Sequence, residues 1–219
     1  FSLKAYCFLE LNKPIEAEKL YLEAINKGHI SALHGIAILY LKQGKLIEAE
    51  HYFLQAIAKG QMKAYNNLAI LYEDMAKNDQ AEQFYLAAVR TGSIRALYNL
   101  AIFYKNQGKE DAAEYYFLQA IEKGDTGAFF NLAVLYMEQG KILEAEKYYI
   151  KAIEKEHPGA LNNLAVLYQN QNKVAEAEEY YIRAIDKGRI ESFISLAGLY
   201  YLTNQKGQEA LNYGRSYYE

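Results

Sequence analysis

Four asparagines at equal spacing along the chain are the side chains with the clearest potential for chemistry in this sequence. They are Asn67, Asn99, Asn131 and Asn163. A primary amide both donates and accepts hydrogen bonds, so a row of amides can pair with the N–H and C=O groups of an extended peptide without contacting its side chains. If such a row lines an open surface, it forms a peptide-binding ladder. The alternative is a structural role, in which each amide bonds a neighbouring helix.

The histidines and the Gly-Lys pairs do not form a reactive site. No two histidines have the i, i+4 spacing with which a helix presents two ligands to one metal ion. The four are His29, His34, His51 and His157. Pairs such as Gly44-Lys45 lack both the preceding strand and the spacing of a phosphate-binding loop. We therefore expect surface histidines, helix-ending Gly-Lys turns, no metal and no cofactor.

The acidic pairs, the lone cysteine and the tyrosines also have structural interpretations. Glu-Ala-Glu runs at 48–50, 144–146 and 176–178 begin helical segments, where carboxylates interact favourably with the helix dipole on a solvated face. Cys7 lies within an apolar pattern, which predicts a core position. Most of the 22 tyrosines fall on packing positions. Because no nucleophile is placed beside a base, we predict that the chain is not an enzyme.

The elements that position these side chains follow from a 32-residue repeat. Asn67–Tyr72 (Asn-Leu-Ala-Ile-Leu-Tyr) recurs in related form six times, and the repeat units begin at Ile30, Met62, Ile94, Thr126, Pro158 and Ile190. Counting positions from each start, apolar residues occupy 4, 7, 8, 10 and 11 and then 20, 23, 24, 27 and 28. Both sets have helical spacing. The asparagines fall at position 6, so we call them the position-6 asparagines.

Helix-ending residues separate the two helical segments of each unit. Position 15 is usually Gly or Asn, and Lys-Gly pairs such as Lys59-Gly60 end the second segment. Both residue types tolerate the left-handed conformation that ends a helix. Ala76 occupies position 15 in one unit, where we expect a weak point. Alanines at positions 8 and 20 let paired helices approach closely. The sequence thus predicts an all-α solenoid of antiparallel helix pairs.

The boundaries of the repeat divide the chain into three parts. We expect a partial repeat at 1–29, five complete repeats at 30–189, and a divergent or truncated repeat or cap at 190–219. Since residue 1 falls inside a repeat, we expect a longer protein, with any signal peptide or preceding domain upstream. A single cysteine favours a reducing compartment, here the cytoplasm. The net charge of −3, with both signs interspersed, argues against nucleic-acid and membrane partners.

The recurring anchor residues resemble the tetratricopeptide repeat signature, which has its anchors at positions 7, 8, 11, 20, 24 and 27. In one unit they are Leu164, Ala165, Tyr168, Ala177, Tyr181 and Ala184. Units of this family usually have about 34 residues, whereas these 32-residue units are shorter and have a Lys-Gly ending that resembles SEL-like repeats. The resemblance implies a right-handed superhelix whose first helices line a concave groove. The position-6 asparagines would then be similar to the ladder with which the tetratricopeptide domain of O-GlcNAc transferase holds extended peptides.

The same resemblance implies which other side chains face the groove. We expect Tyr98 and Phe130 to be exposed aromatic anchors with Met137 nearby, and Lys63 and Arg95 to contact a carboxylate or phosphate. The expected partner is an extended protein segment, and polyproline II matches a rung at every third residue. Two alternatives stay open: a ligand-responsive sensor domain that controls a fused effector, and a structural spacer that self-associates end to end.

Overall fold

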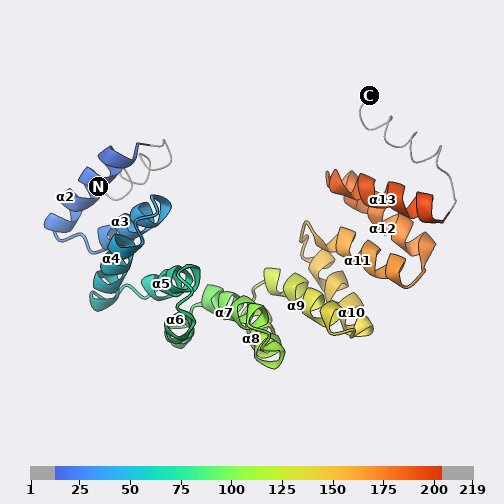
Figure 1. The fold of residues 1–219 in the computed structure, drawn as a ribbon, viewed down its shortest axis with the longest axis horizontal. Helices are drawn as coiled ribbons and strands as arrows, with labels where there is room; N and C mark the ends of the chain where they lie inside the picture. The colour runs from blue at the N-terminus through green and yellow to red at the C-terminus, as the bar shows by residue number, and fades with distance from the viewer. Residues whose placement is uncertain (1–12, 204–219) are drawn as a thin grey trace. The chain divides into compact units, whose positions relative to one another are not determined.

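The computed structural model describes residues 13–203, and all regular secondary structure in that range is α-helical (Figure 1). The helices are α2 (Pro14–Asn26), α3 (Ser31–Lys42), α4 (Leu46–Ala58), α5 (Lys63–Asp74), α6 (Asn78–Arg90), α7 (Ile94–Asn106), α8 (Glu110–Glu122), α9 (Gly127–Glu138), α10 (Ile142–Glu154), α11 (Ala160–Asn170), α12 (Val174–Asp186) and α13 (Glu191–Leu202). Each predicted repeat unit between 30 and 189 supplies two of them. No helix among these is long and apolar enough to cross a membrane.

The described residues form two compact parts that divide between residues 103 and 104, inside α7. In the first part α3 packs on α4 and α5 on α6, and in the second part α9 packs on α10 and α11 on α12. Each pair is an antiparallel hairpin (Figure 1). The predicted all-α solenoid of helix pairs is therefore confirmed.

The turn inside each hairpin has the left-handed residue that the sequence predicts. Gly44 has φ of 71°, and the backbone N–H of Lys45 donates to the carbonyl of Tyr40 at 2.9 Å. This pairing satisfies a carbonyl that the helix end would otherwise leave open. Ala76 adopts the same conformation with φ of 56°. Because its Cβ is unfavourable there, this turn costs more free energy than its glycine counterparts.

Small and large side chains alternate in the core. The described alanines at position 20, such as Ala81, are fully buried, and so are those at position 8 from Ala37 to Ala165. Position 24 carries five of the six fully buried aromatic side chains among the largest, which are Phe53, Tyr85, Phe117, Tyr149 and Tyr181. Burying an aromatic ring of this size stabilises the fold by roughly 1.5–3 kcal/mol. The alanines therefore let the helices pair closely, and the position-24 rings fill the remaining space in the core.

A phenol–carboxylate hydrogen bond links successive repeat units. The tyrosine at position 11 donates to the glutamate 22 residues earlier, at position 21 of the preceding unit. The described pairs are Tyr40–Glu18 (3.0 Å), Tyr72–Glu50 (2.7 Å), Tyr136–Glu114 (2.9 Å), Tyr168–Glu146 (2.8 Å) and Tyr200–Glu178 (2.6 Å). The lysine at position 16 lies over the same ring, with its Nζ 5.4 Å from the ring centroid in the Lys77–Tyr72 pair.

These links correct our interpretation of the Glu-Ala-Glu runs. The first glutamate of each run, such as Glu48, is exposed in the first turn of its helix, where the dipole explanation holds. The second glutamate, such as Glu50, is half-buried, and its carboxylate accepts a hydrogen bond from the tyrosine hydroxyl of the next unit. The predicted core role of Cys7, and the cap predicted beyond Thr203, lie outside the described residues.

Candidate functional site on the first helices

The position-6 asparagines lie on the first helix of each hairpin and are half-buried. They are Asn67 on α5, Asn99 on α7, Asn131 on α9 and Asn163 on α11. Partial exposure leaves part of each amide accessible to a ligand. The two compact parts carry two asparagines each, and each part is described by itself.

In the first part, both asparagines bond the first helix of the preceding unit. Asn67 Nδ2 lies 2.8 Å from His34 Nε2, and Asn99 Nδ2 donates to Asn66 Oδ1 at 3.0 Å. The partner residue stands at position 5 in both cases. Since an amide has two N–H groups and a carbonyl with two lone pairs, one such bond uses only part of its capacity. The amides are therefore anchored as the structural alternative anticipated, while capacity for a ligand remains.

His34 is neutral at pH 7 in this arrangement. Burial lowers the pKa of His34, and the charge of Lys63 lowers it further. Because Asn67 Nδ2 can only donate, His34 Nε2 is the acceptor and the ring proton sits on Nδ1. The His34 ring also packs edge-on against Phe53, with ring centroids 5.8 Å apart. These contacts fix both the tautomer and the orientation of the partner of Asn67.

In the second part, the two asparagines have different partners. Asn131 Nδ2 donates to the carbonyl of Gly127, one turn earlier in its own helix, over a long 3.4 Å. Asn163 hydrogen-bonds the hydroxyl of Tyr149; burial raises the pKa of that hydroxyl, and the Asn163 bond partly offsets the rise. The Tyr149 hydroxyl in turn points at Met137 Sδ, 3.6 Å away. The four position-6 asparagines are thus equally spaced in the sequence but have different hydrogen-bond partners.

The expectation that Tyr98 and Phe130 are exposed aromatic anchors is wrong, since both are half-buried. Phe130 stacks on His157, with ring centroids 4.2 Å apart and an interplanar angle of 17°. Met137 is half-buried too, beside the Tyr149 hydroxyl. These three side chains therefore contribute to packing before any ligand arrives, and only their remaining edges can contact one.

Both predicted cationic contacts are exposed, whereas only two of the four histidines are. Lys63 and Arg95 are exposed in the first turns of α5 and α7, as a ligand contact requires, although their role stays a prediction. His29 and His51 are exposed, whereas His34 and His157 are half-buried, so the expectation of surface positions holds for only two of the four. Within residues 13–203, no three His, Cys, Asp or Glu side chains gather as metal ligands do.

Sequence reasoning missed the partners at position 5, especially Asn66, which is 5% exposed, and His34. A usable signal was present. Position 5 of one unit and position 6 of the next are 33 residues apart, and both pairs at that spacing in the first part are polar. A polar pair whose spacing is one longer than the repeat indicates bonding between first helices.

Comparison with known proteins agrees with this architecture. Two models described as tetratricopeptide repeat match residues 29–62, 93–123 and 159–192 in one case and 63–91 and 126–154 in the other, together more than half of the chain. Neither describes a catalytic domain. No curated protein matches the sequence.

Solved structures with similar folds come from several bacteria. One, from the functional characterization of Pseudomonas aeruginosa PilF, has 20% identity and a TM-score of 0.69, covering 85% of this chain and 89% of that one. A tetratricopeptide repeat protein from Parabacteroides merdae has 20% identity, a TM-score of 0.67 and coverages of 97% and 89%. The C-terminal part of another from Cytophaga hutchinsonii has 17% identity, a TM-score of 0.72 and coverages of 96% and 92%.

At these identities the likeness establishes the fold alone. The repeat matches go further, because they follow the 32-residue units through most of the sequence. Repeats of this kind are typically non-enzymatic and bind protein partners. This chain belongs to the tetratricopeptide repeat family, whose helical hairpins form scaffolds for protein–protein interaction.

Proposed function

We propose that the chain holds an extended segment of a partner protein against its first helices, and that the position-6 asparagines bond the backbone of that segment. The observation that carries this proposal is the anchoring of Asn67 and Asn99. Each is half-buried, and each uses its amide nitrogen to bond the preceding first helix. An amide fixed in this way loses little conformational freedom when a ligand binds, which favours affinity.

The expected strength of the ladder is modest. A hydrogen bond contributes about 0.5–1.5 kcal/mol net, so the two asparagines of one part contribute roughly 1–3 kcal/mol. That free energy corresponds to binding weaker than about micromolar. The remaining affinity comes from neighbouring side chains, for which the exposed cations Lys63 and Arg95 and the half-buried Ile70 and Ile102 at position 9 are candidates.

The spacing of the rungs favours one peptide conformation. Packed first helices lie roughly 10 Å apart, and polyproline II rises about 3.1 Å per residue with three residues per turn. One asparagine then meets every third ligand residue on the same side of the peptide. A β-strand, whose side chains alternate with a period of two, matches this spacing less well.

The test begins with peptides selected by this protein from a displayed library of random 12-residue sequences. Affinity for the strongest of them is measured by fluorescence anisotropy with the wild type and with the double variant Asn67→Ala/Asn99→Ala, both of whose substitutions lie in the first part. Loss of two bonds at about 0.7 kcal/mol each predicts at least tenfold weaker binding. Asn106→Ala/Asn170→Ala is the matched control, because both asparagines are exposed at position 13 of first helices.

A second, independent test addresses recognition of the peptide backbone. Methylating a ligand backbone nitrogen removes a donor, so N-methylation at one position in three should weaken binding as much as the double variant does. Equal affinity of the wild type and Asn67→Ala/Asn99→Ala, with unchanged melting, would refute the ladder.

A further inference from the structure

The tyrosines at position 24 direct their hydroxyls at position 12 of the same hairpin. In two hairpins the acceptor is a carboxylate or amide oxygen 2.7 Å away, in the pairs Tyr85–Glu73 and Tyr181–Gln169. In the α9–α10 hairpin, the Tyr149 hydroxyl points instead at Met137 Sδ, 3.6 Å away. Because a thioether sulfur is only a weak acceptor, this hydroxyl lacks the strong partner that the other two have.

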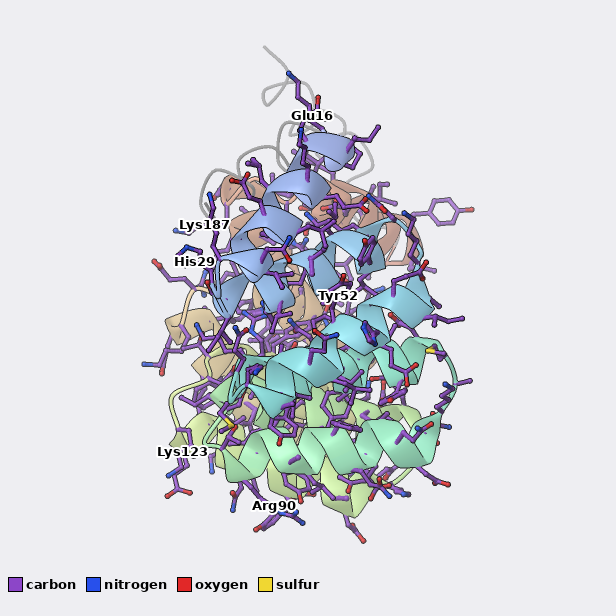
Figure 2. The ribbon with its side chains drawn as sticks, turned by 90° about the vertical axis from the view of Figure 1, so that its left-hand side faces the viewer. Glu16, His29, Tyr52, Arg90, Lys123 and Lys187 are labelled. Atoms are coloured by element: carbon purple, nitrogen blue, oxygen red, sulfur yellow. The ribbon has the colours of Figure 1, made fainter. Side chains whose placement is uncertain are left out.

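The residue at position 12 otherwise matches the residue at position 24. Where position 24 is phenylalanine, as at Phe53 and Phe117, position 12 holds Leu41 or Lys105, and neither side chain accepts a hydrogen bond. Tyrosines at position 23 differ. Tyr52, labelled in Figure 2, packs its ring on that of the position-11 tyrosine, with centroids 5.6 Å apart. In the hairpins described at both positions, an oxygen at position 12 thus accompanies a hydroxyl at position 24, except in α9–α10.

The hydroxyl of Tyr149 is fixed in its orientation. The side chain is fully buried, and its oxygen is hydrogen-bonded by the Asn163 amide, which leaves the hydroxyl proton to point at the sulfur. Within residues 13–203 that proton has no acceptor besides Met137. The nearby carboxylate of Glu138 is already paired with Lys105 at 2.9 Å. A strong acceptor for Tyr149 must therefore come from the Met137 side chain itself.

An oxygen atom added to Met137 Sδ would supply that acceptor. The 3.6 Å between the sulfur and the Tyr149 oxygen exceeds an ordinary O–H···O distance, about 2.7–2.8 Å, by less than one covalent bond length. A sulfoxide oxygen can thus reach the proton with little movement of either side chain. Met137 is half-buried rather than enclosed, which leaves part of it open to a small oxidant. Its sulfoxide oxygen would then play the part of the Glu73 and Gln169 oxygens.

We propose that Met137 is a site of reversible oxidation, and that its sulfoxide accepts a hydrogen bond from Tyr149. The oxidant is a peroxide. One oxygen of hydrogen peroxide bonds to the sulfur, the O–O bond breaks, and the other oxygen leaves as water with both protons. The sulfur loses two electrons, which the peroxide gains. Methionine sulfoxide reductases reverse the change. This site does not rest on the proposed function.

The expected consequence is opposite to that of ordinary oxidative damage. Oxidation of a packed methionine usually disrupts its surroundings, because it turns an apolar side chain into a polar one. At Met137 the new oxygen meets a buried hydroxyl that has no strong acceptor. The sulfoxide should therefore tie α9 to α10 more firmly than the thioether does.

The first test asks whether the modification forms, with hydrogen peroxide as the probe and mass spectrometry of peptide fragments as the readout. The chain has three methionines, of which Met62 is 50% exposed. In the folded protein we expect Met137 to gain one oxygen at a rate within about tenfold of that of Met62, since susceptibility follows exposure. The site would be overturned if Met137 reacted only in urea while Met62 was fully converted in the folded protein.

The second test measures the effect on melting. The variant Met62→Leu/Met75→Leu keeps Met137 as its only methionine. Oxidation should raise its Tm by about 2–4 °C, as one hydrogen bond does in a chain of this length. Adding Tyr149→Phe should remove the rise. Equal shifts with and without Tyr149→Phe, in either direction, would overturn the hydrogen bond.

Two features make this comparison clean. Phenylalanine already occupies position 24 at Phe53 and Phe117, so Tyr149→Phe is expected to fold, and its own melting curve checks this. Peroxide also reacts with thiols, and Cys7 is the single cysteine. The same treatment of Met137→Leu therefore measures any shift in Tm that does not come from Met137.

The variant Met137→Gln tests the same hydrogen bond without an oxidant. Gln169 already accepts the Tyr181 hydroxyl from the same position at 2.7 Å. Met137→Gln should therefore melt about 2–4 °C above Met137→Leu, and the advantage should vanish when each is combined with Tyr149→Phe. An advantage that persists without the hydroxyl, or none with it, would show that an oxygen at this place does not bond Tyr149, and the proposal would fall.

Discussion

Replacing Tyr72 by phenylalanine tests the links between repeat units. The Tyr72 hydroxyl donates to Glu50 at 2.7 Å, and the side chain is 3% exposed. Lys77 lies over the ring and 3.9 Å from Glu50 Oε2, so the carboxylate keeps a cationic neighbour in the variant. The substitution therefore deletes the hydroxyl and removes one hydrogen bond from Glu50 while leaving the ring in place.

The expected loss in the free energy of unfolding depends on the charge of the acceptor, the Glu50 carboxylate. Hydrogen bonds to charged groups contribute about 1.5–3 kcal/mol, and partial exposure of Glu50 points to the lower end. We expect Tyr72→Phe to lower the free energy of unfolding by about 1–2 kcal/mol at pH 7. For a chain of this length that corresponds to a fall in Tm of roughly 2–8 °C.

The effect should also depend on pH in a specific direction. Burial, followed by the hydrogen bond and charge of Glu50, raises the pKa of Tyr72 to about 12. An unfolded tyrosine ionises near pH 10, so the unfolded chain loses its proton first and stability falls as pH rises from 10 towards 12. The advantage of the wild type over Tyr72→Phe should therefore shrink, by roughly 0.5 kcal/mol at pH 10.5 once solvent screening at the partly exposed Glu50 is allowed for.

Urea denaturation of both proteins at pH 7, 9 and 10.5, followed by circular dichroism, measures this difference. Tyr65→Phe on the same helix is the control, because Tyr65 is half-buried and packs on Phe84 through its ring. Equal stability of Tyr72→Phe and Tyr65→Phe at pH 7 would refute the reasoning. So would a difference between wild type and Tyr72→Phe that grows with pH.

Further substitutions address the turns, the first helices and acid stability. Ala76→Gly should stabilise the chain by about 0.5–1 kcal/mol, because glycine adopts a φ of 56° without the Cβ penalty; urea denaturation measures the gain, and a loss would contradict it. Gly35→Ala should destabilise it by more than about 1 kcal/mol, since the new Cβ would meet the Tyr21 ring; a thermal melt checks this, and Tyr21→Leu should restore part of the loss. Burial and Lys63 lower the pKa of His34, so its neutral form stabilises the fold and that contribution fades as pH falls below about 6.5. His34→Gln should flatten this fall between pH 7 and 5 in melting experiments, and an unchanged profile would contradict it.

The repeat made most of the fold predictable. Helix limits, hairpin pairing and the left-handed residues at position 15 all follow from local spacing and residue type, which act within one unit. The turn at Ala76 keeps the same conformation although alanine is unfavourable there, because the surrounding core fixes the turn.

The candidate site was less predictable, because its contacts join side chains of different units. Phe130 looked exposed from its position, yet His157 folds back over its ring from the turn after α10. That stack depends on which residue occupies this turn, and the repeat pattern carries no information about it. Asn66 likewise gains its partner Asn99 only when two first helices lie side by side.

The tyrosine–glutamate pairs have a consequence for how the chain is made. In each described pair the phenol comes 22 residues after its carboxylate in the sequence. During synthesis from the amino end, a new hairpin therefore emerges with the acceptor that it needs already present on the ordered hairpin before it. Assembly can keep pace with translation, one hairpin at a time, without waiting for distant parts of the polypeptide.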